Sequence, residues 1–313
     1  DEGIPESASK YIIKSWRTST QKQYITYLKQ WEVFCNTRGF HPISPPLEVA
    51  LEFLAQLADR DLGYSVVNTA RSALSSVLVL PNGIVFGQHP YVKRLLKGVF
   101  ETKPALPRYT CVWDVEIVLN YLKNLGSNTE LTLKLLTFKL VILLGLLSGQ
   151  RCQTLHCLNI KDMVLEKSKC VFLLTSLLKT SAPSRHLTHI ELLAYPQDPN
   201  LCVINCLNAY LERTKPHRSG ILQLFLSIQK PFKAVSCDTI SRWLKSVLDM
   251  AGIDTNIFSA HSTRTASASC AKAKGLPCPV IMAAADWRSE STFAKFYDKC
   301  ILKENFGGKL LEQ

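Results

Sequence analysis

The segment Glu-Thr-Lys-Pro-Ala-Leu-Pro, which starts at residue 101, most constrains how this chain can fold. Its two prolines lack a backbone N–H donor and disfavour helix in the residues before them. The segment has no apolar periodicity, whereas the sequence on both sides of it does. A chain of 313 residues with 47% hydrophobic side chains is long enough for two cores. We therefore predict two domains, residues 1–103 and 108–313, joined by a linker at residues 104–107.

Apolar residues recur at helical spacing in four stretches of the first domain. The first stretch starts at the capping pair Ser19-Thr20 and ends at Gly39, and the second follows Pro45-Pro46. The third and fourth stretches cover approximately residues 65–78 and 90–100. The first domain is therefore predicted to be a four-helix, all-α domain.

Small polar and basic side chains lie on the outer faces of the last two predicted helices. On the third helix they are Arg71, Ser72 and Ser75, and on the fourth Lys93, Arg94 and Lys97. Small polar groups let a backbone phosphate come close, and the net charge of +12 suits a polyanionic partner. For any one of these side chains a solvated charge is the simpler interpretation. Together they predict a DNA-facing surface.

The second domain is predicted to be mainly helical with a small antiparallel sheet. One helix starts after Asp114, and a long buried helix covers residues 130–147. Short β-type segments then follow around residues 163–164, 169–175 and 186–192, with a turn at 179–184. Further helices are expected at residues 202–213 and 237–250, and three more in the terminal region. The predicted fold class is thus mainly α, of the α+β type.

The cysteines and the apolar runs exclude several classes of protein. Eleven cysteines without framework spacing indicate reduced thiols of an intracellular protein, and no complete zinc-ligand pattern is present. The most apolar run, Leu140 to Leu147, is too short to span a membrane. The chain starts at Asp1 without a methionine, as a piece cut from a longer reading frame would.

Five side chains fit the cleavage of a phosphodiester without a metal ion. Such cleavage needs a nucleophile, cations on the non-bridging oxygens and an acid for the leaving oxygen. Tyr297 offers a phenol, while Arg151 and Arg264 each offer a bidentate fork. His261 lies three residues before Arg264, and Lys179 lies on a predicted turn. Each has an ordinary structural alternative, such as a core tyrosine or a charge at a helix C-terminus. Only their order and spacing together favour a site.

That order resembles the tyrosine recombinase (phage integrase) family. The elements that carry the resemblance are Gly149-Gln150-Arg151, Lys179 on a hairpin turn, His261-x-x-Arg264, Trp287 and Tyr297. The phrase from Ala285 to Tyr297 is similar to recombinases of DIRS-like, Ngaro-like and Crypton-like mobile elements or their domesticated relatives. Residues 1–103 resemble the family's core-binding (SAM-like) domain, and residues 108–313 its catalytic domain.

The resemblance implies a role for each matching residue. Tyr297 would attack the scissile phosphate and form a 3′-phosphotyrosyl bond, while Arg151 and Arg264 hold the non-bridging oxygens. Lys179 would be the general acid for the 5′ oxygen, and His261 would assist proton transfer from Tyr297. Trp287 would pack and hydrogen-bond. The implied reaction is site-specific recombination or integration of double-stranded DNA, with no metal, ATP or other cofactor.

The resemblance also implies an assembly and a location. We expect a homo-tetramer on two DNA duplexes, a monomer or dimer off DNA, no membrane association and a nuclear location. Apolar residues after Tyr297, including Ile301, Leu302, Phe306, Leu310 and Leu311, have near-helical spacing. This tail would pack either on its own domain or on a neighbouring protomer.

Two positions depart from the family pattern. Thr154 stands where many relatives have an acid that orients the first arginine, and Thr265 follows Arg264 where a second histidine is frequent. A second hypothesis is therefore a catalytically silent, domesticated DNA-binding module of the same fold. A type IB topoisomerase, which shares the chemistry, fits the compact two-domain length less well.

Overall fold

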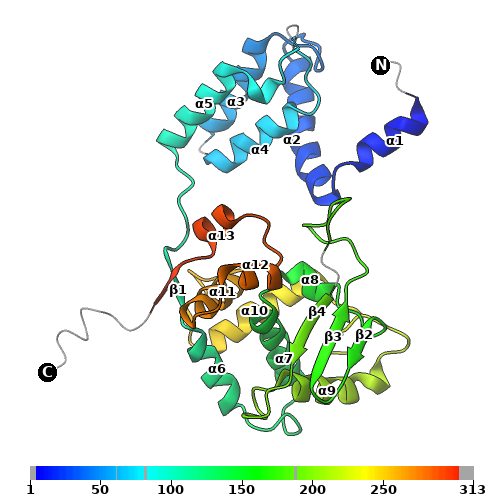
Figure 1. Cartoon of the computed structure of the whole chain (residues 1–313). Coiled ribbons are helices and arrows are strands. Elements are labelled where there is room, and N and C mark those ends of the chain that lie inside the picture. Colours follow the sequence, from blue (N-terminus) through cyan, green and yellow to red (C-terminus); the bar gives the residue numbers. More distant parts are fainter. Residues whose placement is uncertain (1–4, 61, 81–82, 187–188, 303–313) are drawn as a thin grey trace, which may run out of the picture. The chain divides into compact units, whose positions relative to one another are not determined.

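The computed structural model describes residues 5–60, 62–80, 83–186 and 189–302. The chain divides into two compact units, Asp1–Pro107 (unit 1) and Arg108–Gln313 (unit 2) (Figure 1). This division falls at the C-terminal end of the predicted linker. Among the described residues, no helix is both long and apolar enough to cross a membrane.

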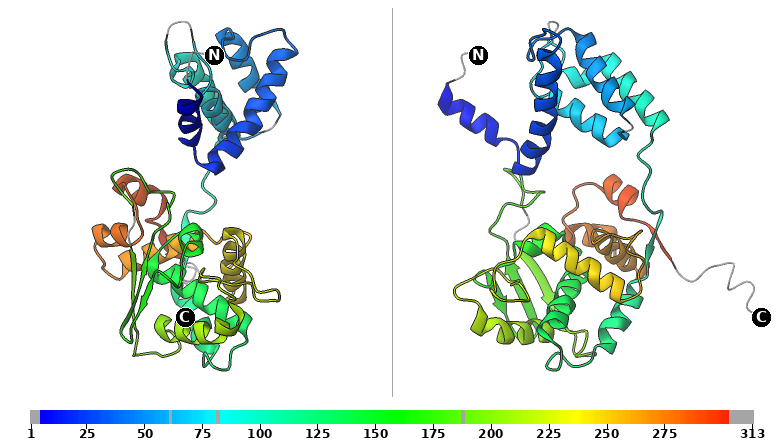
Figure 2. Two further views of the ribbon diagram at one scale, coloured as in Figure 1. Left: turned by 90° about the vertical axis from the view of Figure 1, so that its right-hand side faces the viewer. Right: turned by 180° about the vertical axis from the view of Figure 1, so that it is seen from behind.

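Unit 1 is a bundle of helices, seen from two further sides in Figure 2. The four predicted helices are present as α2 (Thr18–Asn36), α3 (Leu47–Asp59), α4 (Tyr64–Leu74) and α5 (Pro90–Thr102), with a 3-10 turn, η1 (Phe86–Gln88), before α5. A further helix, α1 (Glu6–Lys14), precedes them. The sequence analysis did not predict α1, a short helix of which no residue is buried.

An aromatic cluster fills the core of unit 1. Trp31 and Phe34 of α2 pack on Phe53 of α3, with ring centroids 5.3 and 5.2 Å from that of Phe53. The indole N–H of Trp31 donates to the Pro42 carbonyl at 2.8 Å, so this buried donor is satisfied.

Unit 2 is mainly helical with a small antiparallel sheet, as predicted. The sheet has the order β2 (Met163–Leu165), β3 (Lys169–Leu173), β4 (His189–Leu193). Its helices are α6 (Val115–Asn124), α7 (Leu133–Ser148), α8 (Cys152–His156), α9 (Val203–Thr214), α10 (Cys237–Met250), α11 (Ser262–Ala273), α12 (Cys278–Ala284) and α13 (Glu290–Phe296), with a 3-10 turn, η2 (Lys215–His217), after α9. The central α7 is buried over most of its length and packs against α9, α10 and α11.

A parallel strand pair joins the two ends of unit 2. Strand β5 (Cys300–Leu302) pairs with β1 (Cys111–Trp113), and a disulfide links Cys111 to Cys300. The prediction that every cysteine is a reduced thiol is therefore wrong for this pair, whose members are 189 residues apart in sequence. The near-helical spacing after Tyr297 was also misleading, since Ile301 and Leu302 belong to a strand. Phe306, Leu310 and Leu311 lie outside the described residues.

Candidate active site

The Tyr297 side chain lies among three of the predicted site residues. Tyr297 is the C-cap residue of α13, and its hydroxyl is 3.3 Å from Nε2 of His261. Its ring centroid is 4.5 Å from that of Trp287 and 5.4 Å from the guanidinium carbon of Arg264. The Ser269 hydroxyl on α11 donates to the Tyr297 carbonyl at 2.8 Å, which fixes the backbone at this position. The phenol therefore belongs to a cluster built within one chain.

Arg264 is the most buried cation of the cluster, with 2% of the residue exposed. Its guanidinium donates to the Gly149 carbonyl at 2.8 Å and to the Ala285 carbonyl at 2.6 Å. It thereby ties the end of α7 to the end of α12. Its Nε–H has no partner among the described residues, so a donor remains for an anion.

The second arginine, Arg151, follows directly after the C-terminal end of α7. Gly149 has a φ of +60°, the left-handed conformation that ends helices, and an added Cβ would lie 3.2 Å from that of Ala285. Both the backbone conformation and the close approach of Ala285 therefore favour glycine at this position. Arg151 follows as the N-cap residue of α8. In the described structure its side chain has no hydrogen bond or ion pair, so its guanidinium remains available to bind a phosphate.

The positive charges of Arg151 and Lys179 act on His261. Desolvation of the ring is the largest cause that lowers the pKa of His261, although the residue as a whole is exposed. The other causes are the positive charges of three neighbours, Arg264, Arg151 and Lys179. Burial, followed by the charge of Arg151, also lowers the pKa of Arg264. The neutral form of His261, which can accept a proton, is therefore favoured by its surroundings.

Trp287 forms the buried wall of the site. It is 4% exposed and packs between Phe293 and Tyr297, while the Arg264 guanidinium carbon lies 4.2 Å from its ring centroid. Its indole N–H is buried and lacks a partner in the described part of the chain. Unpaired buried donors are rare, and this one suits an anionic oxygen.

All six candidate catalytic residues thus converge in unit 2. Thr154, at the position noted as a departure, is buried, and its N–H donates to the Arg151 carbonyl at 2.9 Å. It supplies no carboxylate to orient Arg151. Within the described ranges, no group of three His, Cys, Asp or Glu residues could hold a metal ion.

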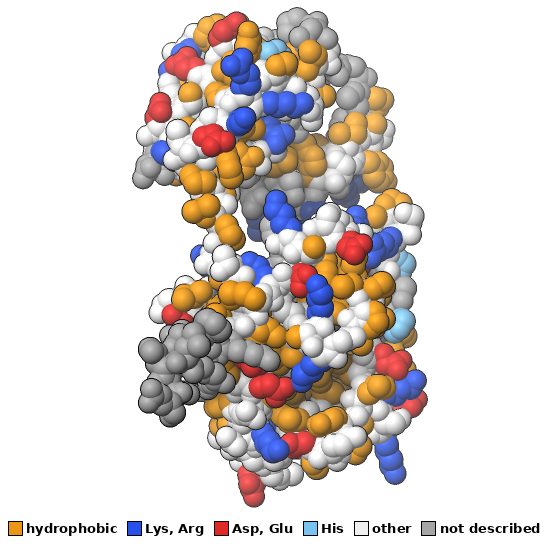
Figure 3. Space-filling model, turned by 60° about the vertical axis from the view of Figure 1, so that its left-hand side comes forward, with side chains coloured by type: hydrophobic (Ala, Val, Ile, Leu, Met, Phe, Trp, Pro, Cys, Tyr) orange, Lys and Arg blue, Asp and Glu red, His pale blue; other side chains and the backbone are white. Residues whose placement is uncertain are grey.

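Three of the predicted DNA-facing residues line one hollow of unit 1. Arg71, Lys93 and Lys97 surround a cavity of about 400 Å³ with Tyr64 and Phe100 at its sides. Figure 3 shows Lys and Arg side chains gathered on the face of unit 1 that it presents.

The other three predicted residues contribute differently. Arg94 is exposed but does not line the cavity. The Ser72 and Ser75 hydroxyls donate to backbone carbonyls of their own helix, at 2.9 and 2.7 Å, and are partly buried. They place a small polar surface beside Arg71 but already have acceptors.

The absence of a side chain at Gly87 leaves room for the Arg71 side chain. A Cβ added at Gly87 would lie 2.8 Å from the Cδ and Nη1 atoms of Arg71 and 2.4 Å from the Ser75 hydroxyl. Gly87 lies in η1 and follows Arg71 by 16 positions, so no local spacing in the sequence connected the two residues.

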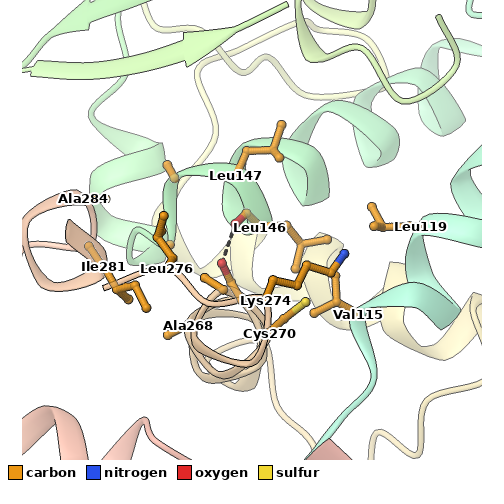
Figure 4. A pocket seen from close by; sticks show the side chains of 15 residues that line it. Val115, Leu119, Leu146, Leu147, Ala268, Cys270, Lys274, Leu276, Ile281 and Ala284 are labelled. Carbon is orange, nitrogen blue, oxygen red and sulfur yellow. Dashed lines mark hydrogen bonds between the residues drawn. The ribbon is translucent and has the colours of Figure 1, made fainter. Parts of the chain in front are cut away.

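A separate pocket of about 300 Å³ lies between α6, α7, α11 and α12 (Figure 4). Its lining is almost entirely aliphatic, and its one cation, Lys274, forms an ion pair with Glu116 at 2.7 Å. None of the six candidate residues lines it. This pocket is therefore separate from the Tyr297 cluster.

Comparisons with known proteins fit this architecture. No family model matches the chain. The chain is 21% identical to the integrase/recombinase xerD homolog of Selenomonas ruminantium over 314 residues, which covers 97% of this chain and 89% of that protein. Among solved structures, it is similar to XerH site-specific recombinase bound to a palindromic difH substrate in a post-cleavage complex, with a TM-score of 0.56 and 15% identity. That match covers 80% of this chain and 69% of XerH.

The chain has the tyrosine recombinase fold. A lambda integrase tetramer bound to a Holliday junction matches 90% of this chain and 72% of its own, with a TM-score of 0.51 and 16% identity. The predicted mainly α fold with a small antiparallel sheet is confirmed.

Proposed function

We propose that this chain is a site-specific recombinase or integrase of the tyrosine recombinase family, which cleaves and rejoins double-stranded DNA. The observation that carries the proposal is the convergence of a tyrosine hydroxyl, a histidine with a lowered pKa and two arginines in one site. The fold shared with recombinases bound to DNA supports it.

In the cleavage step, the Tyr297 oxygen attacks the scissile phosphorus and its proton passes to Nε2 of His261. The bond between phosphorus and the 5′ oxygen breaks, and Lys179 gives a proton to that oxygen. Arg151 and Arg264 neutralise the non-bridging oxygens, and the Trp287 N–H donates to one of them. The products are a 3′-phosphotyrosyl bond and a free 5′-hydroxyl.

The rejoining step reverses this sequence with a 5′-hydroxyl from another duplex. The phosphotyrosyl bond conserves the energy of the broken phosphodiester, so we propose that neither ATP nor a metal ion takes part. The two guanidiniums supply the positive charge that a metal ion would otherwise provide.

We further propose that Arg71, Lys93, Arg94 and Lys97 of unit 1 bind the DNA backbone, and that the active form is a homo-tetramer on two duplexes. The similarity to the lambda integrase tetramer supports this assembly. The phrase from Ala285 to Tyr297 favours an origin in a mobile element, for which a nuclear site of action would follow.

The second candidate is a DNA-binding module that has lost turnover. Thr154 favours it, because no carboxylate at that position orients the Arg151 guanidinium. A selection from random nicked duplexes separates the two candidates. A recombinase is expected to retain DNA through a denaturing wash, and Tyr297→Phe should retain none. Retention through a native wash alone, in a salt-dependent manner, would instead support the binding module.

A further inference from the structure

The loop between β3 and β4 is fixed on the N-terminal side of Lys179. Leu178 is 3% exposed and belongs to the main core of unit 2. Its N–H donates to the Ser181 hydroxyl at 3.0 Å, and the Ser181 N–H donates back to the Leu178 carbonyl at 3.0 Å. The backbone of Lys179 is therefore held in a closed turn, while its side chain is exposed.

The same loop is fixed on the C-terminal side through Asp286. Asp286 is buried, and its carboxylate accepts hydrogen bonds from the Thr180 hydroxyl and from the Arg185 guanidinium, the latter at 3.3 Å. Arg185 also donates to the Trp287 carbonyl at 3.4 Å, and Arg288 donates to the Thr180 carbonyl. These contacts join segments that are more than one hundred residues apart in sequence.

The backbone conformation at Asp286 indicates that its carboxylate has a role in addition to forming the turn. Its φ of +55° is left-handed, a conformation that glycine adopts most readily and aspartate tolerates better than most other residues. A buried carboxylate must also be paired, and hydrogen bonds to a charged group are roughly twice as strong as neutral ones. Glycine would meet the backbone requirement alone, so the carboxylate has a role beyond the turn.

We propose that Asp286 is a positioning residue that holds the Lys179 loop over the Tyr297 site. Building on the proposed strand-transfer function, it acts through Thr180, the next residue after Lys179 in the chain. Asp286 also directly precedes Trp287, which packs on the Tyr297 ring. The turn at Asp286 thereby positions both Trp287, which packs on Tyr297, and the loop that carries Lys179.

A competing route runs through Arg264. The negative charge of Asp286 also favours the protonated form of Arg264, so removing it could weaken phosphate binding instead. A change of the leaving atom from oxygen to sulfur distinguishes an effect through Lys179 from an effect through Arg264. A thiol is far more acidic than an alcohol, so a 5′-bridging sulfur leaves without protonation and makes a general acid unnecessary. A defect in holding Lys179 is rescued by sulfur, whereas a defect in phosphate binding is not.

The experiment compares covalent capture of an oxygen-bridged duplex and its 5′-sulfur counterpart, both built on a sequence retained in the denaturing selection. Asp286→Gly keeps the left-handed backbone and removes the carboxylate. We expect it to slow capture of the oxygen duplex about 10- to 100-fold, which is part of the roughly 100- to 10,000-fold contribution of a positioned general acid, and to capture the sulfur duplex at the wild-type rate. Lys179→Ala should show the same pattern, and the double variant should lose no more than Lys179→Ala alone.

Two further variants guard against a general loss of fold. Thr180→Val removes the donor on the loop side and should reproduce the Asp286→Gly pattern. Asp198→Asn removes a carboxylate that pairs with Lys123 at 3.2 Å elsewhere in unit 2, and should leave both rates unchanged.

Three outcomes would overturn the proposal. They are wild-type capture of the oxygen duplex by Asp286→Gly, equal slowing of both duplexes by Asp286→Gly, and rescue of Lys179→Ala but not of Asp286→Gly by sulfur. If sulfur failed to rescue Lys179→Ala, the general-acid role itself would be wrong. If the wild-type protein formed no adduct at all, the proposed function would fail before this question arose.

Discussion

Replacement of Arg264 and of Arg151 should have different effects on stability, although both residues are proposed to hold the scissile phosphate. Arg264 donates to two buried carbonyls, those of Gly149 and Ala285, and is itself buried. The Arg151 side chain makes no hydrogen bond within the described structure, and the residue is only half-buried. Arg264→Ala should therefore destabilise unit 2, whereas Arg151→Ala should not.

The magnitude follows from the hydrogen bonds. Each bond to a charged donor contributes about 1.5–3 kcal/mol, so the two together contribute about 3–6 kcal/mol. Relief of the buried charge offsets part of this loss, which leaves about 3 kcal/mol. At about 2–4 °C per kcal/mol for a unit of this size, Arg264→Ala should lower the melting temperature by about 6–12 °C. For Arg151→Ala we expect a change below about 2 °C, since a residue without such contacts changes stability by about 0.5 kcal/mol or less.

Differential scanning calorimetry of the full chain measures both effects. Arg264→Lys is the matched intermediate, because it keeps the charge but cannot reach both carbonyls, and it should fall between the wild type and Arg264→Ala. Equal melting temperatures for Arg151→Ala and Arg264→Ala would refute the structural role assigned to the buried guanidinium.

Three further predictions follow from the geometry. Because burial and nearby cations lower the pKa of His261, covalent capture should fall as the pH decreases, with a midpoint below about 6.5. Arg151→Lys keeps the positive charge, so its midpoint should also lie below about 6.5. A wild-type midpoint above about 6.5 would contradict the role assigned to His261. In gel-shift titrations, Gly87→Ala should weaken DNA binding, because the added Cβ displaces Arg71. The slope of log affinity against log salt concentration should fall by about one. Gly98→Ala is the control and should change neither quantity, since a Cβ at Gly98 meets open space. Cys300→Ser should lower the unfolding free energy of unit 2 by about 2–4 kcal/mol, and dithiothreitol should destabilise the wild type but not this variant.

Local patterns were sufficient to predict most of the helices and the three-stranded sheet. The apolar spacing of α2 to α5 and the alternation in β3 and β4 directly reflect which side chains are buried. Helix α1, of which no residue is buried, was not predicted. The pairing of β1 with β5 escaped because Cys111 and Cys300 are far apart in sequence, and no local spacing relates them.

The site was predictable only in part for the same reason. His261, Arg264 and Tyr297 form one terminal motif. Arg151 and Lys179 lie in separate stretches, and they were connected to that motif by the chemical roles they could fill and by the family resemblance. In the structure, the charges of Arg264, Arg151 and Lys179 all lower the pKa of His261. The contact of Asp286 with the Lys179 loop was invisible in the sequence, because it joins a turn residue to a hairpin across the fold. The available signal was Asp286 itself, a charged residue between the apolar Ala285 and Trp287. Its left-handed backbone, a conformation that favours glycine, became known only from the structure.

The most direct test of the central claim is to map the DNA–protein bond in the captured adduct. After nuclease and protease digestion, mass spectrometry should find a nucleotide attached to the peptide that contains Tyr297. End-labelling should show that the protein blocks the 3′ end of the break and leaves a free 5′-hydroxyl. Attachment to the 5′ end, or to any residue other than Tyr297, would contradict the mechanism.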